Sequence, residues 1–289
     1  MLRSRYVIVL LTFVTIGMAV GALLQLAFLK QLEESSSMFP SEPSRLSIFL
    51  SLRYLVACCI CTVYSIWKND EDARILRIGM VKQEMLNWQP RIILFHNFLS
   101  ADECDHLINL ARPKLAKSTV VDTNTGKGIE SKVRTSTGMF LTFVDRKHKV
   151  IEAIERRISV YAMVPVENGE LLQVLRYEPG QYYKAHHDYF SDEFNLKRGG
   201  QRVATMLMYL SDGVEGGETF FPSVGDKECS CGGEMKRGIC VKPKRGDAIL
   251  FWSVKLDGSK DPSSLHGGCK VLVGEKWSST KWMRQETFT

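Results

Sequence analysis

The second half of the chain is a series of short β-rich segments, and this pattern limits the possible folds more than any other feature. Such segments cover residues 171–177, 203–210, 248–252 and 277–283. Turns rich in glycine, proline and aspartate, such as Glu178-Pro179-Gly180, separate them. Two helices are expected earlier, because Ser100 and Glu103 form a capping-box pattern and residues 145–161 place isoleucines on one helical face. Helices followed by many short strands predict an α+β domain with a β-sandwich or jelly roll backed by helices.

The N-terminus carries an apolar stretch of membrane-spanning length. Residues 6–29 contain no charged side chain, and a helix of that length would extend about 36 Å, against a hydrocarbon core of about 30 Å. Arg3 and Arg5 precede the stretch, so the positive-inside rule keeps residues 1–5 in the cytoplasm. A cleaved signal peptide is the alternative, but its apolar region usually covers only about 7–15 residues. We therefore expect a type II signal anchor, a transmembrane helix that is not removed.

A second apolar stretch, residues 48–67, leaves the topology open. Arg53 interrupts it, and the part that follows is short for a membrane span. If it crosses the membrane, everything after it returns to the cytosol. We assign residues 30–79 as a stem that contains this stretch, and residues 80–289 as a folded luminal domain.

The sharpest chemical signal is the motif His186-His187-Asp188. Residues i and i+2 of a strand point to the same face, so His186 and Asp188 could bind one metal ion while His187 points away. His266 is the best third ligand, because His96, His106 and His148 lie before the β-rich region. Two histidines and one carboxylate leave coordination positions open, as in non-haem Fe(II) oxygenases. For the motif alone, an exposed loop histidine beside an acid is the plainer reading.

Lys276 adds to this signal. It follows His266 by one or two strand lengths and stands next to Trp277. An oxygenase of this type needs a dicarboxylate co-substrate, whose far carboxylate requires a fixed cation. Lys276 could supply that cation, although a solvated surface lysine is the alternative.

Long strings around these residues resemble one family. In chain order they are LLQVLRYEPGQYYKAHHDYF, GGQRVATMLMYLSD, VEGGETFFP, KPKRGDAILFW and SSLHGGCKVLVGEKWSSTKWM. They are similar to the plant-type, membrane-anchored prolyl 4-hydroxylases, which are Fe(II)/2-oxoglutarate-dependent dioxygenases. The resemblance covers about residues 88–289 and the N-terminal anchor.

The resemblance implies a fold, a reaction and a compartment. The fold is a double-stranded β-helix, or jelly roll, backed by helices. The reaction hydroxylates peptidyl proline at C4 with Fe(II), O2 and 2-oxoglutarate, releases succinate and CO2, and uses ascorbate to rescue oxidised iron. The substrates would be proline-rich secretory or cell-wall glycoproteins, and the enzyme would be a single-pass protein of the endoplasmic reticulum or Golgi membrane.

The resemblance also implies roles for single residues. His186, Asp188 and His266 would hold Fe(II), and Lys276 would pair with the far carboxylate of 2-oxoglutarate. The rest of the co-substrate pocket would comprise Tyr177, Thr205 and Trp282. The peptide groove would comprise Arg134, Ser136, Glu170, Tyr183 and Arg202. Such an aromatic-lined groove suits the extended polyproline II conformation of proline-rich peptides.

Two features depart from the family pattern or stay open. Arg284 stands where the family often carries a groove histidine, which puts the preferred proline context in doubt. Five cysteines lie in the folded part, at positions 104, 229, 231, 240 and 269. In an oxidising lumen some should pair and one should stay free. A zinc site built from Cys229, Cys231 and Cys240 is the alternative, although it lacks a clear fourth ligand.

Other functions fit the sequence less well. A different peptidyl or small-molecule 2-oxoglutarate dioxygenase would share the metal residues. A type II membrane glycosyltransferase would share the anchor and stem, but its D-x-D motif could only be Asp70-Glu71-Asp72, ahead of the folded domain. A non-catalytic prolyl-peptide binder would need a broken metal triad. The mild net charge of +6 argues against a nucleic-acid partner, and the oligomeric state is not predicted.

Overall fold

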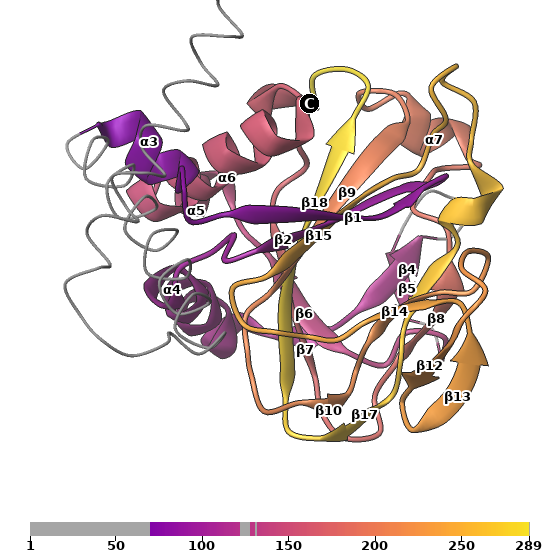
Figure 1. The fold of residues 1–289 in the computed structure, drawn as a ribbon. Coiled ribbons are helices and arrows are strands. Elements are labelled where there is room, and N and C mark those ends of the chain that lie inside the picture. The colour runs from indigo at the N-terminus through magenta and orange to yellow at the C-terminus, as the bar shows by residue number, and fades with distance from the viewer. Residues whose placement is uncertain (1–69, 122–127, 131, 289) are drawn as a thin grey trace, which may run out of the picture. The chain divides into compact units, whose positions relative to one another are not determined.

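The computed structural model describes residues 70–121, 128–130 and 132–288 (Figure 1). The cytoplasmic tail, the signal anchor and the apolar stretch at residues 48–67 lie outside this part of the chain. Within the described ranges, no helix is both long and apolar enough to cross a membrane.

Five α-helices occur in the described residues, and two of them match the expected pair. The helices are α3 (Glu71–Leu76), α4 (Ala101–Ala111), α5 (Phe143–Arg146), α6 (Lys149–Ala162) and α7 (Glu193–Leu196). The predicted capping box starts α4: Ser100 Oγ accepts from the Glu103 amide at 3.1 Å, and Glu103 Oε2 accepts from the Ser100 amide at 2.8 Å. The helix expected over residues 145–161 is split between α5 and α6, and its isoleucine face is buried as expected.

An eight-stranded antiparallel sheet forms the larger layer of the described part of the chain. In spatial order its strands are β1 (Lys82–Trp88), β2 (Arg91–His96), β15 (Ala248–Trp252), β9 (Arg202–Tyr209), β18 (Lys276–Arg284), β7 (Gln173–Tyr177), β6 (Thr137–Phe140) and β3 (Ala116–Lys117). The four β-rich segments expected from the sequence are β7, β9, β15 and β18. The mixed α and β architecture is confirmed.

A four-stranded sheet forms the smaller layer. Its order is β14 (Ile239–Val241), β11 (Thr219–Phe221), β16 (His266–Gly268) and β8 (Tyr183–His186). Three further two-stranded pairs are β10 (Glu215–Gly216) with β17 (Val271–Val273), β12 (Glu228–Cys231) with β13 (Glu234–Arg237), and β4 (Thr119–Val121) with β5 (Gly128–Glu130). A large and a small antiparallel sheet are consistent with the expected jelly roll.

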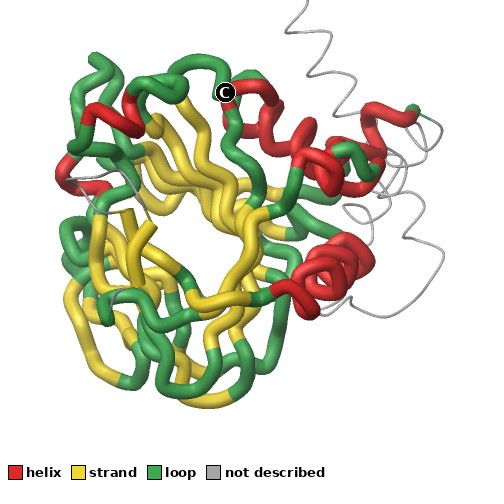
Figure 2. The backbone as a smooth tube through the Cα atoms, turned by 180° about the vertical axis from the view of Figure 1, so that it is seen from behind, coloured by secondary structure: helices red, strands yellow, loops and turns green. Residues whose placement is uncertain are grey.

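The side chains of the large sheet alternate between two cores. On β9, Met206 and Met208 belong to the cluster shared with α4 and α6, whereas Leu207 and Tyr209 pack in the cluster that contains Phe221 of the small sheet. Successive strand residues point to opposite faces, which explains this division. Helices α4 and α6 therefore cover one face of the large sheet, and Figure 2 shows them gathered on one side of the strands. The other face is free to line a site between the sheets.

Helix α3 lies within residues 30–79, the range that we assign to the stem. It contacts helix α6 of the folded domain. Arg157 Nε donates to the carbonyl of Ile75 at 2.6 Å, and the Tyr161 hydroxyl donates to the carbonyl of Leu76 at 3.1 Å. Asp70 caps α3, and Asp72 pairs with Arg156 at 2.9 Å. The acidic residues at 70–72 thus have structural roles, and they are not part of the one metal-type cluster found among the described residues.

Four of the five cysteines pair. The disulfides join Cys229 to Cys240 and Cys231 to Cys269, and Cys104 is a buried free thiol. The zinc alternative for Cys229, Cys231 and Cys240 was wrong, because disulfide sulfurs cannot act as thiolate ligands. Burial raises the pKa of the Cys104 thiol to about 11, so it stays protonated.

Candidate metal and co-substrate site

The three predicted metal ligands lie together. His186 ends β8 and His266 begins β16, and the two residues are directly paired in the register of the small sheet. Asp188 follows two residues after the strand end. The Nε2 atoms of His186 and His266 lie 3.5 and 3.6 Å from the two carboxylate oxygens of Asp188. All three ligand atoms lie within 4.8 Å of one another, and no other such cluster occurs in the residues that the structure describes.

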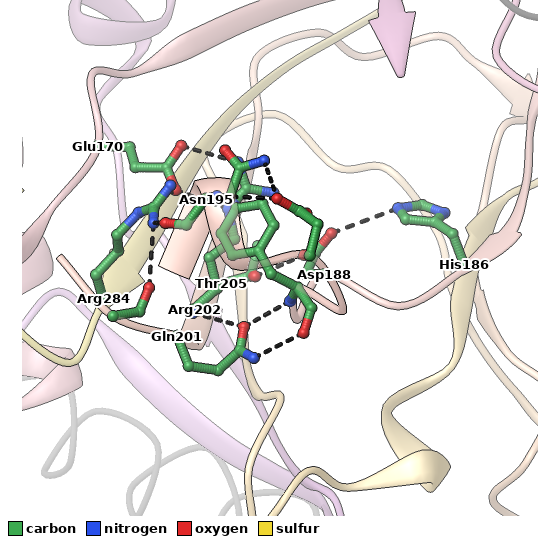
Figure 3. Close-up of polar contacts among 11 residues, drawn as sticks. Glu170, His186, Asp188, Asn195, Gln201, Arg202, Thr205 and Arg284 are labelled. Carbon is green, nitrogen blue, oxygen red and sulfur yellow. Dashed lines mark hydrogen bonds and ion pairs between the residues drawn. The ribbon is translucent and has the colours of Figure 1, made fainter. Parts of the chain in front are cut away.

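The hydrogen bonds around this cluster prepare it for a cation. The Nδ1 atoms of His186 and His266 lie 2.9 and 3.0 Å from the carbonyl oxygens of Lys184 and Ser264. A carbonyl oxygen can only accept, so Nδ1 carries the proton in both rings and Nε2 presents its lone pair to the cluster. Thr205 Oγ1 donates to Asp188 Oδ2 at 2.6 Å and fixes the carboxylate (Figure 3). Two imidazoles and one carboxylate held in this way fit Fe(II).

Burial keeps His266 suited to binding a metal ion. It lowers the pKa of His266 to about 4, against the opposing effect of the Asp188 charge, so this imidazole is neutral near pH 7. A neutral imidazole is the form that coordinates metals. His187 does not join the cluster: its Nε2 lies 3.0 Å from the carbonyl of Pro262 and its ring stacks on Tyr189. This orientation agrees with the alternation expected from the sequence.

A pocket, the inner pocket, extends from the ligands between the two sheets. It is lined by residues of β7, β9 and β18 on one side and of β11 and β16 on the other. Tyr177, Thr205, Lys276 and Trp282, the residues predicted for the co-substrate, all line it. Lys276 and Tyr177 are adjacent because they pair in register across β18 and β7. The structure therefore brings together all the residues predicted for the iron and the co-substrate.

Lys276 carries a buried ammonium that has no neighbouring carboxylate in the described part of the chain. Only 3% of the residue is exposed. Among the described residues, no acidic oxygen lies within 4.0 Å of Nζ, which is 5.5 and 5.7 Å from the ring centroids of Tyr177 and Tyr209. Burial lowers the pKa of Lys276 to about 8, and the more distant Glu218 opposes this effect. A bound dicarboxylate would supply the missing counter-charge.

This lowered pKa predicts a pH-dependent affinity for 2-oxoglutarate. Above about pH 8 the free lysine loses its charge, so the KM for 2-oxoglutarate should rise by up to about tenfold for each further pH unit. Below that pH the KM should be flat. Steady-state assays from about pH 7 to about pH 9.5 measure this effect. In Lys276→Arg the guanidinium stays charged, so its KM should not rise; a wild-type KM that is constant over the range would contradict the prediction.

A second depression, the outer groove, meets the inner pocket at the ligands. Both are lined by Arg134, Tyr183, His186, Asp188 and Trp282. Tyr183 stacks on the His186 ring with centroids 3.7 Å apart, and the Arg134 guanidinium lies 4.8 Å from the Tyr183 ring. Burial raises the pKa of Tyr183 to about 12, so it remains a neutral phenol. A chain in the outer groove would thus pass directly over the metal ligands.

The residues predicted for the peptide groove do not all reach it. Arg134, Tyr183 and Arg202 line the outer groove. Ser136 is buried elsewhere and donates to Ser118 Oγ at 2.9 Å. Glu170 is also buried and is not among the groove residues, so its predicted contact with a peptide amide stays a prediction.

Glu170 instead holds two arginines. Its carboxylate accepts from Arg202 Nε and Nη2 at 2.7 and 2.8 Å, and from Arg284 Nε at 2.8 Å (Figure 3). Arg284 is 2% exposed and also donates to the carbonyls of Asn195 and Gly200. The Arg202 guanidinium in turn lies 4.0 Å from the Trp282 ring. Arg284 therefore supports the groove from behind, through Glu170 and Arg202.

Two groove residues escaped the sequence analysis. Gln173 accepts from Arg134 Nη2 at 2.9 Å and so orients that guanidinium. Phe140 lies 6.2 Å from Trp282, ring to ring, and extends the aromatic surface. Gln173 could have been noticed as the polar residue in the apolar strand LLQVL, because a buried amide in a strand requires a partner. Phe140 gave no comparable signal.

Comparisons with known proteins place the site in a family. The model of the 2OG-Fe(II) oxygenase superfamily matches residues 172–284. Prolyl 4-hydroxylase 1 of Arabidopsis thaliana is 62% identical over 278 residues, which cover 96% of this chain and 95% of that protein. Probable prolyl 4-hydroxylase 8 of Arabidopsis thaliana is 56% identical over 209 residues, covering 69% of this chain and 70% of that protein. Among solved structures, a viral collagen prolyl hydroxylase from Paramecium bursaria Chlorella virus-1 in complex with 2OG is 30% identical, covers 66% of this chain and 94% of that chain, and has a TM-score of 0.49.

Proposed function

Because the chain belongs to the prolyl 4-hydroxylase family of 2OG-Fe(II) oxygenases, we propose that it hydroxylates proline in proline-rich secretory or cell-wall polypeptides. Fe(II), 2-oxoglutarate and O2 are its cofactor and co-substrates, and ascorbate is typical of the family. The observation that carries the proposal is the junction of the two depressions. On one side the metal ligands face a pocket whose buried Lys276 has no carboxylate partner among the described residues, and on the other side they face an aromatic groove.

The residues of the site have different roles in the reaction. His186, Asp188 and His266 would hold Fe(II), which with 2-oxoglutarate supplies the activation of O2 that ends in succinate, CO2 and a hydroxylated substrate. Lys276 would bind the far carboxylate of 2-oxoglutarate, and Thr205 orients Asp188.

Other residues position the substrate and exclude water. Tyr183 and Trp282 line both depressions, so they separate the co-substrate from solvent on the groove side. A polyproline II segment has little conformational entropy to lose on binding, and the rings of Tyr183, Trp282 and Phe140 give its proline rings flat apolar surfaces. C4 of one proline would then lie over the metal ligands.

A coupled assay tests this function. The full chain is incubated with Fe(II), 2-oxoglutarate, ascorbate and a proline-rich peptide, and peptide mass and succinate are read together. We expect one added oxygen atom per hydroxylated proline, matched by succinate. Succinate formation that depends on another peptide or small molecule, with no oxygen added to proline, would indicate a different 2-oxoglutarate dioxygenase and overturn the choice of substrate.

The compartment forms a second part of the proposal. We expect a single-pass type II protein of the endoplasmic reticulum or Golgi membrane with a luminal catalytic domain. The apolar residues 6–29 and the two disulfides support this, since disulfides persist in oxidising compartments. Protease treatment of intact microsomes tests it: a catalytic domain that is digested without detergent would place it on the cytosolic side and contradict the single span.

A further inference from the structure

The small sheet has a second lined face, opposite the metal ligands. On β16 His266 lines the inner pocket, and on β11 Thr219 does the same. The next residue on β11, Phe220, points to the other face and lines a third depression, the hairpin groove, between β8 and the β12–β13 hairpin. This depression borders the site described above, but none of the three metal ligands lines it.

The floor of the hairpin groove is made of small residues. Ala185 of β8 and Gly267 and Gly268 of β16 all line it. The strands are tightly apposed there: a Cβ added to Gly267 would lie 3.0 Å from the carbonyl oxygen of Tyr183 and 3.1 Å from the amide nitrogen of Ala185. A floor without large side chains lets an extended chain lie close to the sheet.

The far wall of the groove is fixed to the strand that carries a metal ligand. The disulfide between Cys231 and Cys269 ties the end of β12 to the residue that follows β16, and the Cys229–Cys240 disulfide ties the start of β12 to β14. The Gly232 amide also donates to Glu218 Oε2 at 2.9 Å. The hairpin is therefore positioned before any ligand binds, which reduces the ordering cost of binding.

The walls combine lysines with aromatic surface. Lys184, Lys236 and Lys270 are exposed at the groove, and its one acidic lining residue, Glu234, pairs with Lys236 at 3.1 Å. Within the described part of the chain, Lys184 and Lys270 have no carboxylate within 4.0 Å. The half-buried rings of Tyr182 and Phe220 supply apolar contacts. The groove is thus complementary to an extended segment that carries acidic side chains.

The hairpin groove continues the outer groove. Three consecutive residues of β8, Tyr183, Lys184 and Ala185, line both depressions. A polypeptide that leaves the outer groove across β8 meets the hairpin groove directly. We propose that the hairpin groove is a second substrate subsite, which binds an acidic segment flanking the hydroxylated proline. The inference rests on the proposed function, because its occupant is the same substrate chain.

A pair of matched peptides tests the subsite with the full chain. Both contain the same proline-rich core; one is extended on both sides by residues rich in Asp and Glu, the other by Ser and Gly to the same length. Two exposed ion pairs contribute about 1 kcal/mol together, so wild-type KM should be about fivefold lower for the acidic peptide. The difference should shrink as salt is added.

Charge reversal identifies the residues. The double variant Lys236→Glu/Lys270→Glu changes side chains that do not line the outer groove, so its kcat and KM on the neutral peptide should match wild type. In this double variant the KM for the acidic peptide should no longer be lower than that for the neutral peptide. A peptide extended with lysine should have the lower KM instead. The control Lys149→Glu carries the same kind of charge change at the exposed start of α6, on the helix side of the large sheet, and should keep the acidic preference.

The outcomes separate the two proposals. Equal KM values for acidic and neutral peptides, both hydroxylated by wild type, would overturn the subsite and leave the proposed function standing. An acidic preference that survives the double charge reversal would place the contact elsewhere and overturn it as well. Failure to hydroxylate either peptide would count against the proposed function itself.

Discussion

Replacing His266 by alanine should remove Fe(II) binding and abolish hydroxylation. His266 presents a neutral Nε2 to the cluster, 3.6 Å from Asp188, and no other histidine among the described residues is close enough to take its place. Loss of a group that only orients a ligand typically costs about 10–100-fold, as we expect for Thr205→Val, so loss of a ligand should exceed that range.

Metal content and turnover measure this effect separately. Iron bound per chain after anaerobic loading should fall to background in His266→Ala, and succinate formation should fall with it. His148→Ala removes an exposed imidazole at the start of α6 and should change neither quantity. Full iron occupancy in His266→Ala would show that His266 is not a ligand, whatever happens to activity.

Replacing Glu170 by glutamine should lower the free energy of unfolding more than either Arg284→Met or Glu167→Gln. The change leaves the buried guanidinium groups of Arg202 and Arg284 without their shared carboxylate. Removing one partner from a buried ion pair costs about 3–5 kcal/mol, because the remaining charge stays desolvated. For a domain of this size that corresponds to a fall in Tm of roughly 6–20 °C.

The stability lost in Glu170→Gln should be greatest at neutral pH and should decrease in acid. Burial opposes ionisation of Glu170, but the charges of Arg202 and Arg284 outweigh it and hold its pKa below the usual range. The stabilisation is therefore complete above the unfolded-state pKa and is lost as the pH falls through the folded-state pKa. Urea unfolding should show a wide gap between wild type and Glu170→Gln near pH 7, which narrows in acid.

Two further variants separate the ion pairs from general surface effects. Glu167→Gln changes an exposed acid three residues away and should alter stability by less than about 0.5 kcal/mol. Arg284→Met removes one charge and leaves the Glu170–Arg202 pair intact, so it should cost less than Glu170→Gln. A Glu170→Gln variant as stable as wild type would show that the cluster does not stabilise the fold.

Local rules anticipated much of the fold. The capping box at Ser100, the isoleucine face of α6 and the strands β7, β9, β15 and β18 all follow from residues close together in the chain. The i, i+2 spacing of His186 and Asp188 also made their shared face predictable. These features depend on backbone geometry and side-chain period, which a sequence displays directly.

The roles of residues that form buried ion pairs or buried hydrogen bonds were harder to predict from the sequence. Glu170 and Arg202 were both expected to contact a peptide, and that contact stays a prediction; the ion pairs that hold Glu170 between Arg202 and Arg284 were not anticipated. Ser136 was assigned to the same groove and lies in a different pocket. Each assignment treated one residue at a time, whereas a buried charge is directed by every partner within reach.

The sequence by itself determined the chemistry of this protein: the ligand types, the lysine for the co-substrate and the strand pattern that carries them. Only the tertiary structure decided the rest. The pairing of β8 with β16 sets His266 opposite His186, and the pairing of β18 with β7 sets Lys276 beside Tyr177. Sheet register depends on the packing of both faces of distant strands, so it is a property of the whole fold. The same long-range packing left Lys276 without a counter-charge among the residues that the structure describes, and it buried Arg284 behind the groove.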